Sequence, residues 1–308
     1  MNELGDSSIT TPAGDVNAEI TVGVALGRPE DDAEGLLARA RAMMRRENPA
    51  TSASGAPRRR RRDDHEASIG DLTRAMSHGD IKAFVQPVAD LHSGQLVGYR
   101  GFARWWYQRQ MLKAGAFIDV VADTPLATVI DRYIARETAA VIALRQRAAP
   151  LHLYTPGSNR LVADVRTEQY LAEIADAFAL APTQVHIEVD ERCLSSWTPS
   201  IFAALRYLRD SGIRASEVGV EIIPQVDDAA RYEFDELRLS RRASNQAVGD
   251  EEARDHVARL VLRAHQLGLT VTASGVDDEQ LRAALRELGC ELATGDVYDR
   301  ARPANAVD

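Results

Sequence analysis

The sequence predicts an α/β fold in which a largely parallel sheet closes into a barrel. From Ser68 onward, short runs rich in β-branched and apolar residues alternate with amphipathic stretches of helical period. This alternation is typical of parallel strands that are joined by helices. The strand-like runs number eight, as in a β/α barrel. We expect strands at residues 83–88, 95–101, 151–155, 185–189, 217–223, 236–239, 270–273 and 291–293.

The helices of this domain fit between the predicted strands. One example spans residues 278–288, where Asp277 is placed to cap the first turn and Gly289 to end the last one. Asp is favoured just before a helix and Gly just after it. In β/α barrels the functional side chains lie at the carboxyl ends of the strands, so the functional residues of this chain are expected there.

Three segments precede the predicted barrel domain of residues 68–308. Residues 1–18 are rich in Gly, Ser, Thr, Asp and Pro without periodicity, which predicts a disordered tail. Residues 19–47 predict one strand and one amphipathic helix, and this pair is too small to bury a core alone. We expect it to pack on the main domain or on a second copy of the chain. Residues 48–67 predict a linker.

The linker carries a run of five arginines, Arg58 to Arg62, followed by Asp63, Asp64 and Glu66. The interpretation that we favour is a solvated segment whose charge is partly neutralised by the acidic residues beside it. The alternative is a site for phosphates or for an anionic membrane surface.

Composition limits the classes of function. The chain has 308 residues, 45% of them hydrophobic, and a net charge of -9. This charge argues against a protein that coats nucleic acid and favours proteins or small molecules as partners. The two cysteines, Cys193 and Cys290, have no metal-binding or disulfide pattern. No apolar run is long enough to cross a membrane and no signal peptide is apparent, so we expect a cytoplasmic protein.

The residues Gly-Tyr-Arg-Gly-Phe-Ala-Arg-Trp at 98–105 resemble a known signature. They are similar to G-Y-E-A-L-x-R-W, the signature of the EAL family of cyclic di-GMP phosphodiesterases. Further motifs of this family recur in its order. They are Y-Y-Q-P-I-V-D, F-I-x-x-A-E, L-E-x-T-E, A-E-G-V-E and G-C-D-x-x-Q-G, at residues 83–90, 117–123, 186–191, 273–277 and 289–295. The resemblance implies a TIM-barrel-like, EAL-type domain, and residues 19–47 resemble the end of a GGDEF domain that is otherwise missing.

The family hydrolyses its substrate with two metal ions, which need several oxygen ligands. The resemblance implies that this chain has replaced most of them. Glu188 takes the place of one metal-binding glutamate and Glu191 that of a loop-supporting glutamate. The other positions carry different residues: Arg100 for the first glutamate, Thr155 or its neighbour for an asparagine, Glu217 beside the missing aspartate pair, Arg238 for a lysine, Ser274 for a glutamate and Thr294 for a glutamine.

One surviving metal carboxylate beside an arginine predicts that no metal binds and that the family's hydrolysis is absent. A fixed Arg100 could neutralise Glu188 in place of a cation. We therefore expect no catalytic residue, no cofactor and no metal. We also considered His152 and His186, which with Glu188 could be metal ligands. Isolated histidines in strands are more often core residues, and we favour that interpretation.

Two functions stay open. The first is a regulatory or scaffolding module that binds an unidentified protein, with a homodimer as one form. Exposed members of the cluster Phe102, Trp105, Trp106, Tyr107 and Met111 could serve as anchors, although Phe102 and Trp105 are expected to be core residues. The second is a metal-independent receptor for cyclic di-GMP or another nucleotide. The resemblance assigns ligand contacts to Gln86 and Arg104, and Arg100 and Arg238 would add positive charge.

Overall fold

The computed structural model describes residues 8–11, 14–17, 67–122, 124–145, 149–164, 166–190 and 199–307. The chain divides into two units, Met1–Asp64 and His65–Asp308. In the first, β1 (Ser8–Thr11) pairs with β2 (Gly14–Asn17) in antiparallel fashion. This strand pair departs from our prediction of a tail without regular structure. The strand and helix predicted within residues 19–47, and the arginine run of the linker, lie outside the described residues.

The second unit is a closed barrel, as the sequence predicted. The strands lie in the ring order β3-β11-β10-β9-β8-β7-β6-β4, and pairing of β3 with β4 closes the ring. All neighbours are parallel except β3, which runs antiparallel to both β4 and β11. The strands are β3 (Ile81–Asp90), β4 (Leu96–Tyr107), β6 (His152–Pro156), β7 (Val185–Asp190), β8 (Arg214–Val220), β9 (Glu236–Leu239), β10 (Thr270–Ser274) and β11 (Leu292–Thr294).

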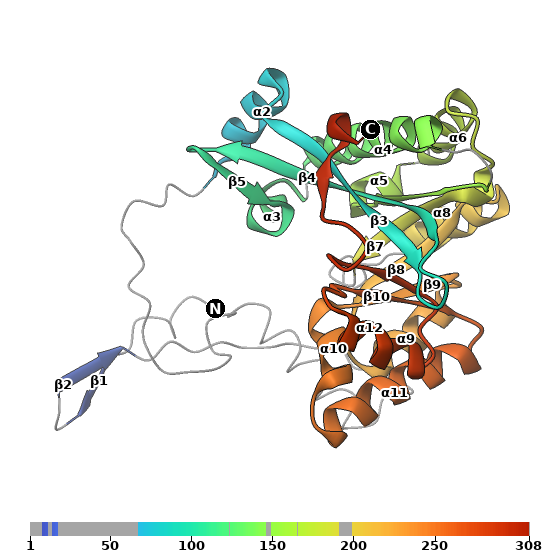
Figure 1. Ribbon diagram of the computed structural model, residues 1–308. Helices are drawn as coiled ribbons and strands as arrows, with labels where there is room; N and C mark the ends of the chain where they lie inside the picture. The colour runs from blue at the N-terminus through green and yellow to red at the C-terminus, as the bar shows by residue number, and fades with distance from the viewer. Residues whose placement is uncertain are drawn as a thin grey trace. The chain divides into compact units, whose positions relative to one another are not determined.

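Helices cover the outside of this barrel or lie beside the far end of β4 (Figure 1). They are α2 (Ile69–His78), α3 (Ile118–Val121), α4 (Pro125–Arg145), α5 (Asn159–Ala163), α6 (Thr167–Ala177), α8 (Pro199–Asp210), α9 (Ile223–Arg231), α10 (Arg241–Asn245), α11 (Glu251–Gln266) and α12 (Glu279–Glu287). The cap of α12 corrects one prediction. Asp278, not Asp277, accepts a hydrogen bond from the Leu281 N–H, while Gly289 follows the helix with φ 93° as expected. None of the described helices is long and apolar enough to cross a membrane.

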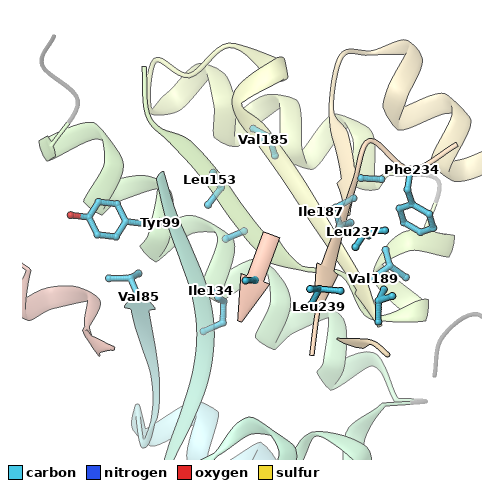
Figure 2. Close-up of a cluster of buried hydrophobic side chains, with 14 of the residues drawn as sticks. Val85, Tyr99, Ile134, Leu153, Val185, Ile187, Val189, Phe234, Leu237 and Leu239 are labelled. Carbon is cyan, nitrogen blue, oxygen red and sulfur yellow. The ribbon is translucent and has the colours of Figure 1, made fainter. Parts of the chain in front are cut away.

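Strand alternation divides the side chains into an outer apolar set and an inner polar set. Successive side chains of a strand point to opposite faces of the sheet. Figure 2 shows the outer set, in which Tyr99, Leu153, Ile187 and Leu237 of four strands gather with Ile134 of α4. The residues between them in the sequence, such as Glu188 and Arg238, therefore face the barrel interior. The outer set forms the main hydrophobic core.

A hairpin extends the sheet beyond the barrel. β4 continues past the predicted end at residue 101 to Tyr107, and β5 (Gln110–Lys113) pairs with its last residues. The turn residues Gln108 and Arg109 have φ values of 46° and 65°, as a tight two-residue hairpin turn requires. The strand β12 (Arg302–Pro303) pairs with the other side of β3.

Gly98 provides a direct test of the barrel packing. A Cβ at this position would lie 2.2 Å from the backbone oxygen of His152 on the neighbouring strand, whereas a Cβ at Gly115 would meet nothing within 4 Å. We expect Gly98→Ala to destabilise the protein by about 2 kcal/mol, because two backbones must move apart. Gly115→Ala, the matched control, should leave the urea midpoint nearly unchanged. Equal midpoints for the two variants would contradict this packing.

Candidate functional site

The carboxyl ends of the parallel strands bring together most of the residues that the sequence singled out. Pairing of Gln86 with Arg100, of Thr272 with Arg238 and of Ser274 with Thr294 places these side chains on the same face of the sheet as Glu188. This shared face is the barrel interior. The site is therefore built from strands β3, β4, β7, β9, β10 and β11.

Glu188 lies between two guanidinium groups. Its Oε2 accepts a hydrogen bond of 2.5 Å from Arg100 Nε, and its Oε1 lies 2.9 Å from Arg238 Nε. The side chain of Arg100 is 28% exposed at the barrel mouth, whereas that of Arg238 is 1% exposed. Burial alone would raise the pKa of Glu188, but the two arginines outweigh it and lower that pKa. Glu188 is thus a buried carboxylate held in its charged form.

A second polar layer lies deeper in the barrel, formed by inward residues two positions earlier on the strands. The Oε1 of Glu236 accepts a hydrogen bond of 2.6 Å from Thr272 Oγ1 and lies 3.5 Å from Arg238 Nη2. The Oε2 of the same carboxyl lies 3.7 Å from His186 Nδ1. His186 Nε2 lies 2.9 Å from His152 Nδ1. Arg238 therefore links the two layers, because it contacts the carboxyl groups of both.

Burial controls the charges of this lower layer. It raises the pKa of Glu236 to about 7, against the attraction of Arg238 and the hydrogen bond from Thr272. Burial also lowers the pKa of His186 well below its usual value, and the positive charge of nearby groups acts in the same direction. Burial lowers the pKa of His152 as well, so the histidine pair is neutral near pH 7.

Two predicted positions do not face the interior. Thr155 pairs with Ile187 and Glu217 pairs with Val189, so both fully buried side chains lie on the outer face of the sheet. The residue that faces the interior next to Glu188 is Pro156. Both neighbours of Thr155 face inward, because Tyr154 pairs with His186 and Pro156 with Glu188.

The remaining predicted residues lie around the mouth or outside the described chain. Gln86 donates a hydrogen bond of 3.4 Å to the backbone oxygen of Asp299. The guanidinium of Arg104 lies 4.3 Å from the ring centre of Phe102 and 5.8 Å from that of Phe84. Ser274 is partly exposed and Thr294 is buried. Glu191 lies outside the described residues.

The described side chains do not fit a divalent cation at the mouth. A hard cation needs several oxygen ligands within coordination distance. The carboxylate of Glu188 lies there, and both of its oxygens already face a guanidinium. Pro156 offers no side-chain oxygen, and Ser274 and Thr294 offer hydroxyls without charge. Among the described residues, no three histidine, cysteine, aspartate or glutamate side chains converge on a metal position.

Comparison with known protein families identifies the domain. The EAL domain model matches residues 69–301, which include every strand of the barrel and the mouth described above. The chain belongs to the EAL family. The barrel with one reversed strand is thus an EAL domain, and the sequence resemblance at residues 98–105 is confirmed at the level of the family.

Curated relatives of the chain are distant. The cyclic di-GMP phosphodiesterase RocR of Pseudomonas aeruginosa is 24% identical over 243 residues, which are 77% of this chain and 61% of RocR. The oxygen sensor protein DosP of Escherichia coli is 21% identical, and the match covers 77% of this chain and 30% of DosP. The chain thus spans less than two thirds of the length of these relatives.

Solved structures support the same fold. A structure of the PaMucR phosphodiesterase in complex with c-di-GMP has a TM-score of 0.70 and 21% identity, covering 78% of this chain and 99% of that one. The FimX EAL domain of Xanthomonas citri, in complex with c-diGMP, has a TM-score of 0.64 and 18% identity, covering 76% and 93%. At this level of identity the comparison concerns the fold alone.

Sequence reasoning missed the lower layer of the site. Glu236 was not singled out, and His186 was expected to be a core residue rather than a metal ligand, without a predicted carboxyl partner. The signal was present in the alternation, since Glu236 lies two residues before Arg238 and His186 two residues before Glu188. Side chains two residues apart on a strand share a face. Any inward residue at the strand end therefore has an inward neighbour one layer below.

Arg238 should be a main stabilising residue of the interior. Arg238→Met would leave Glu188 and Glu236 without the cation that they share, so we expect the free energy of unfolding to fall by about 3 kcal/mol. The control is Arg263→Met, which removes an ion pair with Asp227 whose side chains are 40% and 46% exposed. It should cost about 0.5 kcal/mol or less. Urea titration measures both, and equal losses would contradict the role assigned to Arg238.

Glu236 should make stability depend on pH. Its pKa is raised from 4.5 to about 7 in the folded protein, so folding favours the protonated form. This contribution is fully present below about pH 4.5 and is lost as the pH rises through about 7. Glu236→Gln should remove that part of the decline. Asp131 also has its pKa raised to about 7 by burial and serves as an internal reference, because its contribution persists in the variant. Parallel pH profiles for the two proteins would contradict this assignment.

Proposed function

We propose that this EAL domain acts as a regulatory or scaffolding module in cyclic di-GMP-related signalling, and that it does not hydrolyse the nucleotide. The observation that carries the proposal is the double ion pair of Glu188 with Arg100 and Arg238. The charge that a metal ion would supply to Glu188 comes instead from two side chains of the protein. Function is then assigned to binding.

Two-metal hydrolysis would require the protein to undo this arrangement. A cation at Glu188 would have to displace Arg100 and approach a second, fully buried guanidinium. Two like charges close together in a buried site repel strongly. The metal ions would also have to activate water and stabilise the charge of the phosphoryl group, and Glu188 already shares its charge with two arginines.

A role in signalling is supported by the names of two curated relatives. RocR is named a cyclic di-GMP phosphodiesterase, and DosP is named an oxygen sensor protein. In both, the matching region is only part of a longer chain. We infer that the present domain acts on a partner protein within such signalling. The cytoplasmic location, the homodimer and the GGDEF-like segment stay predictions.

A second candidate is a receptor that binds cyclic di-GMP without metal. It is favoured by Arg104, which is half-buried, stacked on Phe102 and without a salt-bridge partner among the described residues. The PaMucR and FimX structures were solved in complex with the nucleotide. Against it, the charges of Arg100 and Arg238 are already shared with Glu188, which leaves less attraction for a phosphate.

Calorimetric titration with cyclic di-GMP separates these candidates. The nucleotide is added in EDTA, then in magnesium and in manganese, and each sample is assayed for linear product with RocR as the positive control. We expect no product in any condition and no detectable heat of binding. Metal-independent binding without product would favour the receptor, and Arg104→Ala should then weaken it at least about tenfold. Metal-dependent product would overturn the proposal.

A further inference from the structure

The chain contains only two lysines, Lys82 and Lys113, and the fold brings them together. Lys82 of β3 pairs with Arg104 of β4, and Arg104 pairs in turn with Lys113 of β5. The three cations therefore form a row across three neighbouring strands, with all side chains on one face of the sheet extension. Both lysines are exposed and Arg104 is partly exposed.

Apolar side chains border this row on both sides. On the barrel side lie Phe84 and Phe102, which pair across β3 and β4. On the hairpin side lie Trp106 and Met111, which pair across β4 and β5 and are 49% and 40% exposed. By contrast, the intervening Trp105 faces the other way and is buried against Phe117. We call the surface formed by these seven residues of β3, β4 and β5 the hairpin face: Lys82, Phe84, Phe102, Arg104, Trp106, Met111 and Lys113.

The cation row has no compensating anion in the described part of the chain. No described carboxylate lies within salt-bridge distance of its three side chains, and Arg104 donates only to the backbone oxygen of Ala103. Like charges directly opposite each other on neighbouring strands are destabilising. A protein with a net charge of -9 thus keeps an uncompensated basic row between two apolar ones.

We propose that the hairpin face binds an acidic segment of a partner protein. Carboxylates of that segment would lie on the cation row, and apolar side chains beside them would cover Trp106 and Met111. Exposed Trp is a preferred anchor of protein interfaces, and complementary charge sets orientation and association rate. This inference rests on the proposed function, because it specifies which surface of the module meets its partner and the chemistry of that partner.

Charge also argues against a second copy of the chain as the occupant. A symmetric pair of hairpin faces would place one set of three cations against another, which is unfavourable. Nucleic acid would match the cations and could stack on Trp106, but it carries no apolar side chains to cover Met111 and the two phenylalanines that border the row. An acidic protein segment satisfies both the basic row and its apolar borders.

The test uses the full chain and a fluorescent peptide of glutamate and aspartate residues with leucine at both ends. A matched peptide carries glutamine and asparagine in place of each acid. We expect the acidic peptide to bind and the amide peptide to bind at least about tenfold more weakly. The double variant Lys82→Glu/Lys113→Glu should reduce affinity for the acidic peptide at least about tenfold. The control Arg259→Glu/Arg286→Glu reverses two exposed charges on α11 and α12 and should change affinity less than about twofold.

A carbodiimide cross-link gives an independent readout, because it joins a lysine amine to a carboxylate that touches it. With only two lysines in the chain, a peptide cross-linked at either one reports on the hairpin face. We expect cross-links to Lys82 or Lys113, lost in the double variant.

Equal binding of the acidic peptide to the two double variants would overturn the proposal. So would tighter binding of a single-stranded oligothymidine than of the acidic peptide. A homodimer in sedimentation that the lysine variant abolishes, or cross-links from either lysine to acidic residues of the same chain, would also overturn it. The nucleotide assay distinguishes these failures from a failure of the proposed function. Loss of peptide binding without hydrolysis would reject this surface alone, whereas hydrolysis of cyclic di-GMP would reject the proposed function.

Discussion

A single buried carboxylate constrains the interior of this barrel. Glu188 is charged although it is almost fully removed from water, and an isolated charge in such a place is very unfavourable. Arg100 reaches it from the open mouth and Arg238 from within the sheet. Arg238 also approaches Glu236 in the layer below, where burial raises the pKa of that carboxyl to about 7 and keeps the adjacent His186 uncharged. The interior thus balances its charge with its own side chains.

Under the proposed function, this arrangement lets the domain keep its fold without a metal ion at Glu188. The positive charge beside Glu188 comes from two side chains of the protein, Arg100 and Arg238. The outer face of the sheet is unaffected, because its apolar side chains pack on the helices (Figure 2). The sheet extension of β3, β4 and β5 carries a basic row and exposed apolar side chains.

Much of the fold could be predicted from the sequence, because the alternation of strand-like and helical runs is a local signal. All eight barrel strands lie at the expected places, and β9 (Glu236–Leu239) agrees at both ends. The faces of side chains were harder to predict. A shift of one residue reverses the face of a whole strand, and the motifs near Thr155 and Glu217 fixed the position only to within one residue. Register with the neighbouring strands placed Pro156 inward and Glu217 outward. The length of β4 also depends on its partner β5, and no local sequence pattern predicted β5.

The most direct test of the account is a titration with Mn²⁺, with the free ion measured by electron paramagnetic resonance. The account predicts that the wild-type protein and Glu188→Gln bind Mn²⁺ equally weakly, since Arg100 and Arg238 already hold the carboxylate. Stoichiometric binding by the wild-type protein that is lost in Glu188→Gln would contradict it, because Glu188 would then be a metal ligand and the two arginines would have to move aside.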